Sequence, residues 1–398
     1  MKEPMRLGVI GLGRAFTLML PTLSQHPLVR LVAACDPRPD ARARFAADFA
    51  AAGYATAEAL CADPAVQAVY IASPHQFHVD HVTVAAEHGK HVLVEKPMAL
   101  TVADCRAMIS AAKRGGIKLL VGHSHSYDLP YLRTRELIET GDYGQVRMVN
   151  ALNYTDFLYR PRWPEELDTA AGGGVVYSQA AHQVDVVRLL VGGRARSLRA
   201  FTGRWDPARP TEGAYNAQIV FENGAFASLT YSGYGHFDTD EFTGWFGELG
   251  HIRDPATHGA ARALLRTAKT PEEEIQLKNK RAYGPAGSEM FQGGGAGAQP
   301  NNHLAHNHFG LMIVSCDKAD IRPMPDGILI YGDDERRVER LPSPAVPRSE
   351  VVDELYDAAV LGRPPLHSGE WGLATLEICL AILNAAANGQ ETVLHHQI

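Results

Sequence analysis

The stretch that decides the fold is Arg6-Leu7-Gly8-Val9-Ile10-Gly11-Leu12-Gly13-Arg14-Ala15-Phe16. An apolar, strand-like run ends at Ile10, and two glycines lead directly into a segment with helical spacing. Gly11 permits a tight turn. Gly13 lets the backbone approach a pyrophosphate at the helix N-terminus, where Arg14 and Ala15 would offer N–H groups. The third position of this motif is Phe16, which predicts a helix standing farther off the sheet than usual; an ordinary strand–helix turn is the alternative interpretation.

The first 125 residues repeat this strand–helix alternation. Short, branched, apolar runs typical of strands buried on both faces occupy residues 6–10, 29–35, 66–72, 91–94 and 117–121. Apolar residues at helical spacing separate the first three runs: Phe16, Leu20 and Leu23, then Ala41, Phe45 and Phe49. The pattern predicts a doubly wound parallel sheet of the Rossmann type in residues 1–125.

Residues 126–398 follow a different rhythm. Residues 216–222 and 225–232 alternate apolar and polar side chains around Asn223-Gly224, a strong hairpin signal. Further strands are expected at 147–154, 197–202, 311–315 and 328–331, and helices at 174–190, 349–361 and 370–388. The prediction is an α+β domain whose mostly antiparallel sheet is flanked by helices. Residues 254–308, with a charged helical stretch at 271–281 and a glycine-rich run after it, are expected to form an insertion.

Composition narrows the function classes. The 398 residues carry a formal charge of −7, which gives no reason to expect nucleic acid or an anionic membrane as a partner. Five cysteines without C-x-x-C spacing indicate free thiols in a reducing compartment. A strand begins within about five residues of the N-terminus, and no run of about 18 apolar residues occurs, so neither a signal peptide nor a membrane span is expected. A cytoplasmic location follows.

Several polar residues come directly after the predicted parallel strands, at the edge where ligands bind. Asp36 ends the second strand, where a carboxylate can accept hydrogen bonds from both ribose hydroxyls of an adenosine and repel a 2′-phosphate. That favours NAD, although Arg38 could offset the repulsion or stack on adenine, so NADP is not excluded. Ser73, His75 and His78 follow the third of these runs, 66–72. A direct cofactor role for His78 is weighed against simple helix capping.

Two constellations point to proton and hydride chemistry. Glu95-Lys96-Pro97 ends the strand at 91–94, where an ammonium can anchor a ribose and hydrogen-bond an oxygen on a carbon that exchanges a hydride. A surface lysine is the plainer interpretation. Gly172-Gly173-Gly174 precedes a helix with Ser178, His182 and Asp185 at i, i+4 and i+7, on one helical face. His182 could accept a proton from an alcohol at neutral pH, or be a core histidine.

Together, Gly11-x-Gly13, Asp36, the run from Lys90 to Pro97 and the Gly-Gly-Gly…His182-x-x-Asp185 helix resemble the Gfo/Idh/MocA oxidoreductases over almost the whole chain. The resemblance implies a Rossmann domain, an antiparallel-sheet domain that forms homodimers or homotetramers, and Lys96 and His182 as catalytic residues facing nicotinamide and substrate. Two departures stand out. Ser178 replaces an aspartate common in the family, and Ser124-His125-Ser126 stands where many members have Asn-Arg-Arg.

Substrate residues are predicted in three segments, one of which is the helical face that carries Asp185 beside His182. His123 and His125 leave the strand at 117–121, and Arg160 and Arg162 lie among aromatic residues, a setting that suits a planar carboxylate. These segments resemble the family branch that oxidises carboxylated cis-dihydrodiols in phthalate degradation. A sugar or polyol dehydrogenase, an NAD-dependent glycosidase and a non-catalytic dinucleotide sensor are the alternatives. No metal is expected, because no acidic or cysteine ligand accompanies His303, His306 and His308.

Overall fold

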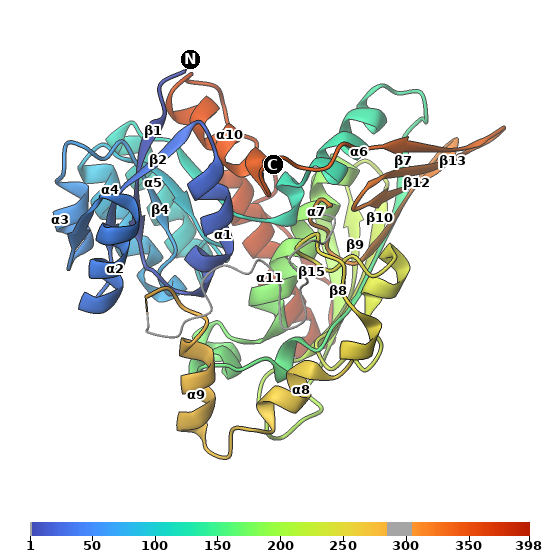
Figure 1. Cartoon of the computed structure of the whole chain (residues 1–398). Coiled ribbons are helices and arrows are strands. Elements are labelled where there is room, and N and C mark those ends of the chain that lie inside the picture. Colours follow the sequence, from blue (N-terminus) through green and yellow to red (C-terminus); the bar gives the residue numbers. More distant parts are fainter. Residues whose placement is uncertain (1, 285–304) are drawn as a thin grey trace. The chain divides into compact units, whose positions relative to one another are not determined.

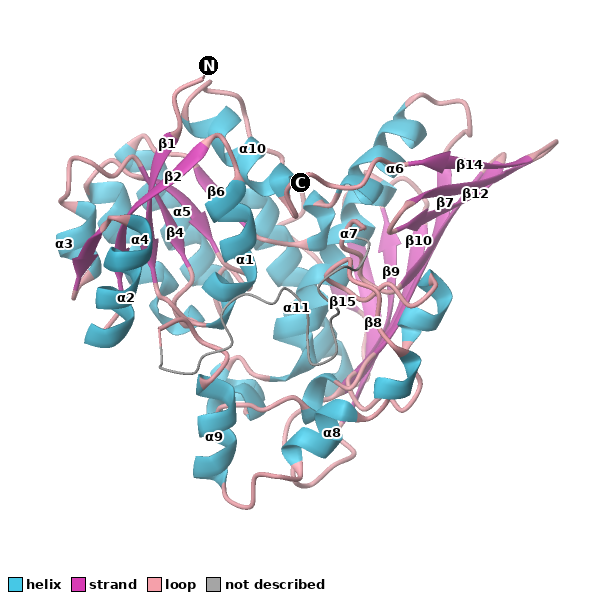
Figure 2. Ribbon diagram, viewed as in Figure 1, coloured by secondary structure: helices cyan, strands magenta, loops and turns pink. Residues whose placement is uncertain are grey.

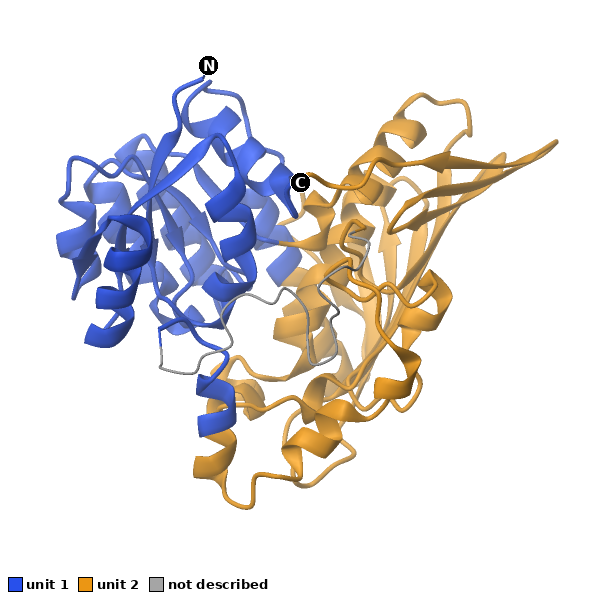
Figure 3. Cartoon of the chain, in the orientation of Figure 1, with its two compact units in different colours: residues 1–123, 276–293, 346–376 blue, residues 124–275, 294–345, 377–398 orange. Residues whose placement is uncertain are grey.

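The computed structural model describes residues 2–284 and 305–398, which fall into two compact units (Figure 3). Within the described residues, the first unit comprises 2–123, 276–284 and 346–376, and the second comprises 124–275, 305–345 and 377–398. Two late segments, which the sequence division placed after residue 125, therefore belong to the first unit. The glycine-rich run at 285–304 and His303 lie outside the described residues.

The first unit contains one six-stranded parallel sheet with strand order β3-β2-β1-β4-β5-β6 (Figure 1). This order, in which the direction of strand addition reverses between β1 and β4, is that of a dinucleotide-binding Rossmann sheet. The strands are β1 Met5–Ile10, β2 Val29–Cys35, β3 Ala52–Tyr54, β4 Ala68–Ile71, β5 His91–Val94 and β6 Leu119–Val121. All five predicted strands are confirmed, and only the short β3 was missed.

Helices connect these strands and cover the sheet (Figure 2). The connecting helices are α1 Arg14–Gln25, α2 Pro39–Phe49, α3 Ala57–Cys61, α4 His78–Glu87 and α5 Val102–Gly115. Helix α10 Ser349–Ala359 comes from a late segment and packs on α1. Phe16, the third residue of the glycine motif, is buried, and its ring packs against Phe45 and Tyr283, with ring centroids 5.9 and 5.3 Å away. This aromatic residue is thus part of the core that α1 shares with α2 and the segment of Tyr283.

The two late segments complete this unit from far along the chain. The Tyr283 N–H donates to the Leu12 carbonyl inside the glycine turn (3.1 Å), and its hydroxyl donates to Asp48 (2.6 Å). The Thr22 hydroxyl donates to the Pro347 carbonyl just before α10 (2.6 Å). The glycine turn is therefore supported by residues more than 250 positions downstream.

The second unit contains a nine-stranded sheet with order β14-β13-β12-β11-β7-β10-β9-β8-β15. Only the β7–β10 pair is parallel, so the expected mostly antiparallel sheet is confirmed. The strands are β7 Val146–Tyr154, β8 Ala195–Gly203, β9 Ala214–Phe221, β10 Phe226–Ser232, β11 Leu311–Cys316, β12 Ala319–Met324, β13 Gly327–Gly332, β14 Arg336–Arg340 and β15 Thr392–Val393.

The predicted hairpin around Asn223-Gly224 forms as β9 and β10, with Gly224 in the left-handed region (φ 86°) that the turn requires. The sequence missed β12 because Pro323 argues against a strand interior, and missed the charged, exposed β14 because edge strands carry no apolar alternation. Helices α6 and α7 pack on the sheet. The helices of this unit are α6 Leu129–Glu139, α7 Ala181–Val191, α8 Ala260–Leu265 and α9 Pro271–Asn279, whose last residues lie in the first unit.

Helix α11, Gly369–Asn388, begins in the first unit and ends in the second. It is the one helix among the described residues that is long and apolar enough to cross a membrane, with 61% of its 18-residue window buried. A core helix of a globular protein meets the same criteria. Leu373, Ala374, Ile378 and Ile382 are buried, which agrees with a core position.

Candidate active site

The glycine turn at the end of β1 is shaped for a close backbone approach. Gly11 has φ 95°, and a Cβ there would lie 2.7 Å from the Ser73 backbone nitrogen, so no side chain fits. Gly13 is the N-cap of α1, and a Cβ on it would meet no atom within 4 Å. Arg14 and Ala15 form the first helical turn. The open space beside Gly13 and the helix N-terminus fit the pyrophosphate of a dinucleotide.

Asp36 is buried directly below this turn. Its carboxylate accepts hydrogen bonds from the Leu12 N–H (2.8 Å) and from the Arg38 N–H (2.9 Å) and Nε (2.8 Å). Burial alone would raise the pKa of Asp36, but the hydrogen bonds from Arg38 and Leu12 lower it. Arg38 also donates to the Leu12 carbonyl (2.9 Å). The arginine is therefore paired with Asp36, a position from which it could offset the charge of that carboxylate.

We expect Asp36→Ala to weaken NAD binding and to shift the NAD-to-NADP preference toward NADP by about tenfold or more, because a hydrogen bond to a charged group is worth about 1.5–3 kcal/mol. Dissociation constants for both dinucleotides, measured by calorimetry, test this. The control is Asp40→Ala, which removes an acidic residue from the first turn of α2. An unchanged preference in Asp36→Ala would remove this carboxylate from the ribose site.

The residues that follow β4 lie within hydrogen-bonding distance of one another and of nearby backbone carbonyls. The Ser73 hydroxyl lies 2.9 Å from His81 Nδ1, and His75 begins a short 3₁₀ turn. Both ring nitrogens of buried His78 face backbone carbonyls, Met98 at 3.1 Å and Ser73 at 3.0 Å. Burial lowers the pKa of His78 to about 4, against the smaller opposing effect of these carbonyls, so the ring is neutral. This geometry favours a structural role for His78 over direct cofactor contact.

Lys96 follows β5 and is half-buried, and its neighbour Glu95 is buried in a polar cluster. The Glu95 carboxylate accepts a hydrogen bond from the Tyr70 hydroxyl (2.5 Å) and lies 3.2 Å from His123 Nδ1. Burial would raise the pKa of Glu95, but the charge and hydrogen bond of His123, with the charge of Lys96, lower it to about 2. His123, predicted to contact substrate, is thus joined to the segment that carries Lys96.

Glu95 should make the first unit sensitive to acid. Its folded pKa of about 2 lies below the ordinary 4.5, so its contribution to stability is complete above about pH 4.5 and is lost as the pH falls toward 2. We expect Glu95→Gln to lower the free energy of unfolding by about 3 kcal/mol at pH 7 and by much less at pH 3. Urea unfolding at both pH values tests this, with exposed Glu87→Gln as the control. An equal loss at both pH values would contradict the ionic role.

In the second unit, the predicted helix at 174–190 has an irregular start. Residues Val176–Ala180 form a π-helical turn before α7, and the Ser178 hydroxyl donates to the Gly174 carbonyl one turn back. π-helical turns occur often at functional sites. His182 lies in the first turn of α7 and is buried. Asp185 accepts a hydrogen bond from the Ser126 hydroxyl and lies 3.9 Å from Arg188, so these contacts tie it to the chain around His125.

The His182 ring belongs to a cluster of three rings, with those of His125 and Phe309. The His125 ring lies edge-on to it with centroids 4.8 Å apart, and the Phe309 ring lies 5.2 Å from His182 and 5.1 Å from His125. His125 Nδ1 lies 2.6 Å from Asp128, and its Nε2 lies 3.2 Å from Glu248. The sequence analysis missed Asp128, Glu248 and Phe309. Asp128 was within reach as an acid three residues after His125, whereas no local signal marks the other two.

The two predicted substrate arginines differ in their surroundings. The Arg162 guanidinium is buried 3.6 Å from the centre of the Phe157 ring and donates to Glu166 (3.1 Å) and the Phe157 carbonyl (2.8 Å). Arg160 has about a third of its side chain exposed and contacts Asp156 at 3.3 Å. Burial would lower the pKa of Arg160, but Asp156 and then Glu248 raise it. Arg160 therefore lies within electrostatic reach of the cluster, while Arg162 fixes its own loop.

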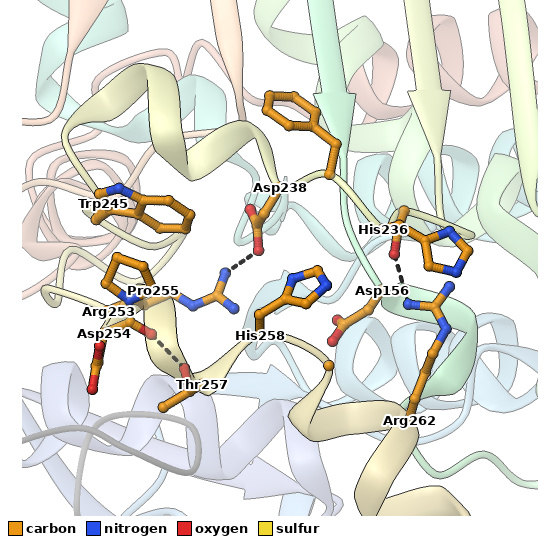
Figure 4. Close-up of a pocket in the computed structure, with 13 residues that line it drawn as sticks. Asp156, His236, Asp238, Trp245, Arg253, Asp254, Pro255, Thr257, His258 and Arg262 are labelled. Atoms are coloured by element: carbon orange, nitrogen blue, oxygen red, sulfur yellow. Dashed lines mark hydrogen bonds and ion pairs between the residues drawn. The ribbon is translucent and has the colours of Figure 1, made fainter.

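A pocket in the same unit adjoins Arg160 through Asp156 (Figure 4). Its two arginines are already engaged. Arg253 is paired with Asp238 (2.5 Å) and Asp240 (2.6 Å), and Arg262 donates to the Gly235 and Tyr234 carbonyls at 2.7 and 2.8 Å. Both guanidinium groups of the pocket are thus held by partners from the same unit.

The histidines near residue 306 are bound to the backbone. His306 Nε2 lies 2.9 Å from the Pro342 carbonyl, and His308 Nε2 lies 2.7 Å from the Phe246 carbonyl. Within residues 2–284 and 305–398, no group of three or more His, Cys, Asp or Glu side chains could hold a metal ion.

Comparison with known proteins agrees with this geometry. The oxidoreductase family profile with an NAD-binding Rossmann fold, GFO/IDH/MocA, matches residues 5–123, and the GFO/IDH/MocA C-terminal domain matches residues 131–253. The chain is 48% identical over 380 residues to 1-carboxy-3-chloro-3,4-dihydroxycyclohexa-1,5-diene dehydrogenase from Comamonas testosteroni, covering 95% of this chain and 94% of that protein.

Solved structures extend the likeness. A putative dehydrogenase from Bordetella bronchiseptica RB50 is 41% identical with a TM-score of 0.89, covering 98% of this chain and 100% of that one. An oxidoreductase from Agrobacterium radiobacter, solved with NAD+, L-tartaric acid and magnesium, has a TM-score of 0.70 at 17% identity and covers 98% of each chain. The second likeness concerns the fold alone.

Proposed function

Since the chain belongs to the Gfo/Idh/MocA family of NAD(P)-dependent oxidoreductases, we propose that it oxidises a carboxylated cyclic cis-dihydrodiol, with 4,5-dihydro-4,5-dihydroxyphthalate as the leading substrate. The observation that carries the proposal is the near full-length match to a dehydrogenase whose named substrate is a cyclohexadiene bearing a carboxylate and two adjacent hydroxyls. Arg160, whose pKa is raised by Asp156 and Glu248, supplies a guanidinium that would recognise the carboxylate.

The first unit fits the dinucleotide. The space beside Gly13 and the N-terminus of α1 would hold the pyrophosphate, and Asp36 with Arg38 would hold the adenosine ribose. Bound NAD(P)+ would supply the hydride acceptor. Glu95, fixed by Tyr70 and His123, holds the backbone next to Lys96 in one conformation, so that the ammonium is positioned at the end of β5.

The proposed reaction breaks two bonds at one carbinol centre. The carbon would lose a hydride, with both electrons, which bound NAD(P)+ would accept, and the hydroxyl would lose its proton to His182 or Lys96. The ketone that results enolises to a catechol, because the ring gains aromaticity. The chain's own task is to bind the diol, orient it and accept one proton.

A panel of cyclic diols, sugars and polyols, assayed by absorbance of reduced nicotinamide, tests the proposal. Stoichiometric NADH with a catechol product supports it. Turnover of a glycoside without net NADH would indicate the glycosidase alternative, activity on neutral sugars alone would indicate a polyol dehydrogenase, and cofactor binding without turnover of any substrate would indicate a sensor.

We also propose that the protein forms a homodimer or homotetramer through the sheet of its second unit. The strand register places Phe201, Phe226, Tyr331 and Val338 on one face of the sheet, and all four are exposed, Phe201 by 74%. Exposed apolar side chains gathered on one face are typical of an interface.

We expect Phe201→Asp to reduce the mass measured by light scattering to that of a smaller assembly, because a buried charge at the interface would be unpaired. The matched control is Phe77→Asp, which changes an exposed phenylalanine of the first unit. A wild-type monomer, or an assembly unaffected by Phe201→Asp, would contradict the proposal.

A cytoplasmic location belongs to the same proposal. All five cysteines lie within the described residues and are free thiols, four of them buried, as expected for a reducing compartment.

A further inference from the structure

His125 is held between two carboxylates. Nδ1 lies 2.6 Å from Asp128 and Nε2 lies 3.2 Å from Glu248, while the ring itself is 1% exposed. A neutral imidazole has one N–H, whereas an imidazolium has two and satisfies both carboxylates at once. Burial alone would lower the pKa of His125, but Asp128 and then Glu248 raise it. The geometry and the charges both favour the protonated ring.

His182 lies directly against this ring, 4.8 Å between centroids. Two positive charges so close in a buried site repel each other, so the pair resists holding a second proton. Asp128 and Glu248 both contact His125, so they favour a proton on the His125 ring. Phe309, which packs on both rings, adds no charge and excludes water.

We infer that His125 and His182 together carry one positive charge at neutral pH, that His125 holds it, and that His125 is a positioning residue which keeps His182 neutral. His125 is then no direct substrate ligand, because both of its nitrogens are engaged. The inference rests on the proposed function only where it uses His182 as the proton acceptor, since a base must be neutral before it accepts a proton.

Other charged groups around the pair are themselves engaged. From α7, Asp185 is bonded to Ser126 and near Arg188. From the segment before β11, His308 faces Asp240 at 3.7 Å. The remaining titratable groups near Asp128 or Glu248 in the second unit are Tyr131, Tyr231, Arg160 and His306.

The test is NMR of the full-length protein labelled with ¹³C at histidine Cε1, titrated from pH 5 to 9. The signals of residues 125 and 182 are assigned by their loss in His125→Gln and His182→Gln. In the wild type, the His125 signal should stay at its charged position through pH 7, and the His182 signal should be at its neutral position. In His125→Gln, the His182 titration midpoint should move upward by roughly one pH unit, because a neighbouring positive charge is gone.

Two further variants make the result specific. Asp128→Asn should bring the His125 signal to its neutral position at a lower pH than in the wild type, whereas His236→Gln, in the pocket of Figure 4, should move neither signal. A charged His182 at pH 7 in the wild type, or an unmoved midpoint in folded His125→Gln, would overturn the inference. The titration needs no substrate and no cofactor turnover, so its result stands even if the diol assay finds no turnover.

Discussion

Lys96→Ala is expected to lower kcat by about 10²–10⁴-fold, the usual cost of removing a general acid–base group. Dinucleotide affinity should change by less than about tenfold, because the phosphates are assigned to the glycine turn, where Gly13 and the N-terminus of α1 lie. Steady-state kinetics on the best diol, together with calorimetry of NAD binding, separate the two effects.

Lys118→Ala is the matched control, because this lysine immediately precedes β6, at the opposite end of the sheet from the ligand-binding edge. It should keep normal turnover. Near-normal kcat in Lys96→Ala would remove Lys96 from the reaction, and an equal loss in both variants would indicate a general effect on the fold.

The second large effect concerns the substrate's charge. If Arg160 binds a carboxylate, the kcat/KM for phthalate cis-dihydrodiol should exceed that for a decarboxylated cis-dihydrodiol by roughly 10–10²-fold, because a hydrogen bond to a charged group contributes about 1.5–3 kcal/mol. Arg160→Lys should raise KM for the anionic diol more than for the neutral one, since an ammonium cannot reproduce the planar fork of the guanidinium.

Arg162→Lys provides the contrast. Its guanidinium is bound to Glu166, the Phe157 carbonyl and the Phe157 ring, so the change should lower thermal stability and leave the ratio between the two diols unaltered. Equal kcat/KM for the two diols in the wild type would end the carboxylate assignment and leave the oxidoreductase family untouched.

Much of the fold could be predicted from the sequence, because each signal lies within one strand, helix or turn. Branched apolar runs marked β1, β2, β4, β5 and β6, and Asn223-Gly224 marked the β9–β10 hairpin. The strands that were missed lack such signals: β14 is charged and exposed, β12 contains Pro323, and β3 and β15 are only three and two residues long. It was harder to predict which residues belong to which compact unit. Tyr283, for example, packs on Phe16, and no local sequence pattern indicates that contact.

The candidate site divides in the same way. Asp36 and Lys96 were visible because each ends a parallel strand, and such strand ends lie at one edge of the sheet. Glu248 could not be predicted as a site residue, since its partner His125 is more than 120 residues away in the sequence. Arg160 and Arg162 looked equivalent in sequence, and only their partners, Asp156 in one case and Glu166 with Phe157 in the other, distinguish them.

The late completion of the first unit has a consequence for biosynthesis. The glycine turn and α1 are synthesised well before their packing partners, because Tyr283 and the residues around α10 follow more than 250 residues later. Phe16 and Phe45 lack the Tyr283 ring until that segment is synthesised. The nascent N-terminal region therefore exposes apolar surface that chaperones recognise. A fragment ending at residue 123 would keep every strand of the parallel sheet and still lack part of its core, and we expect it to aggregate rather than fold alone.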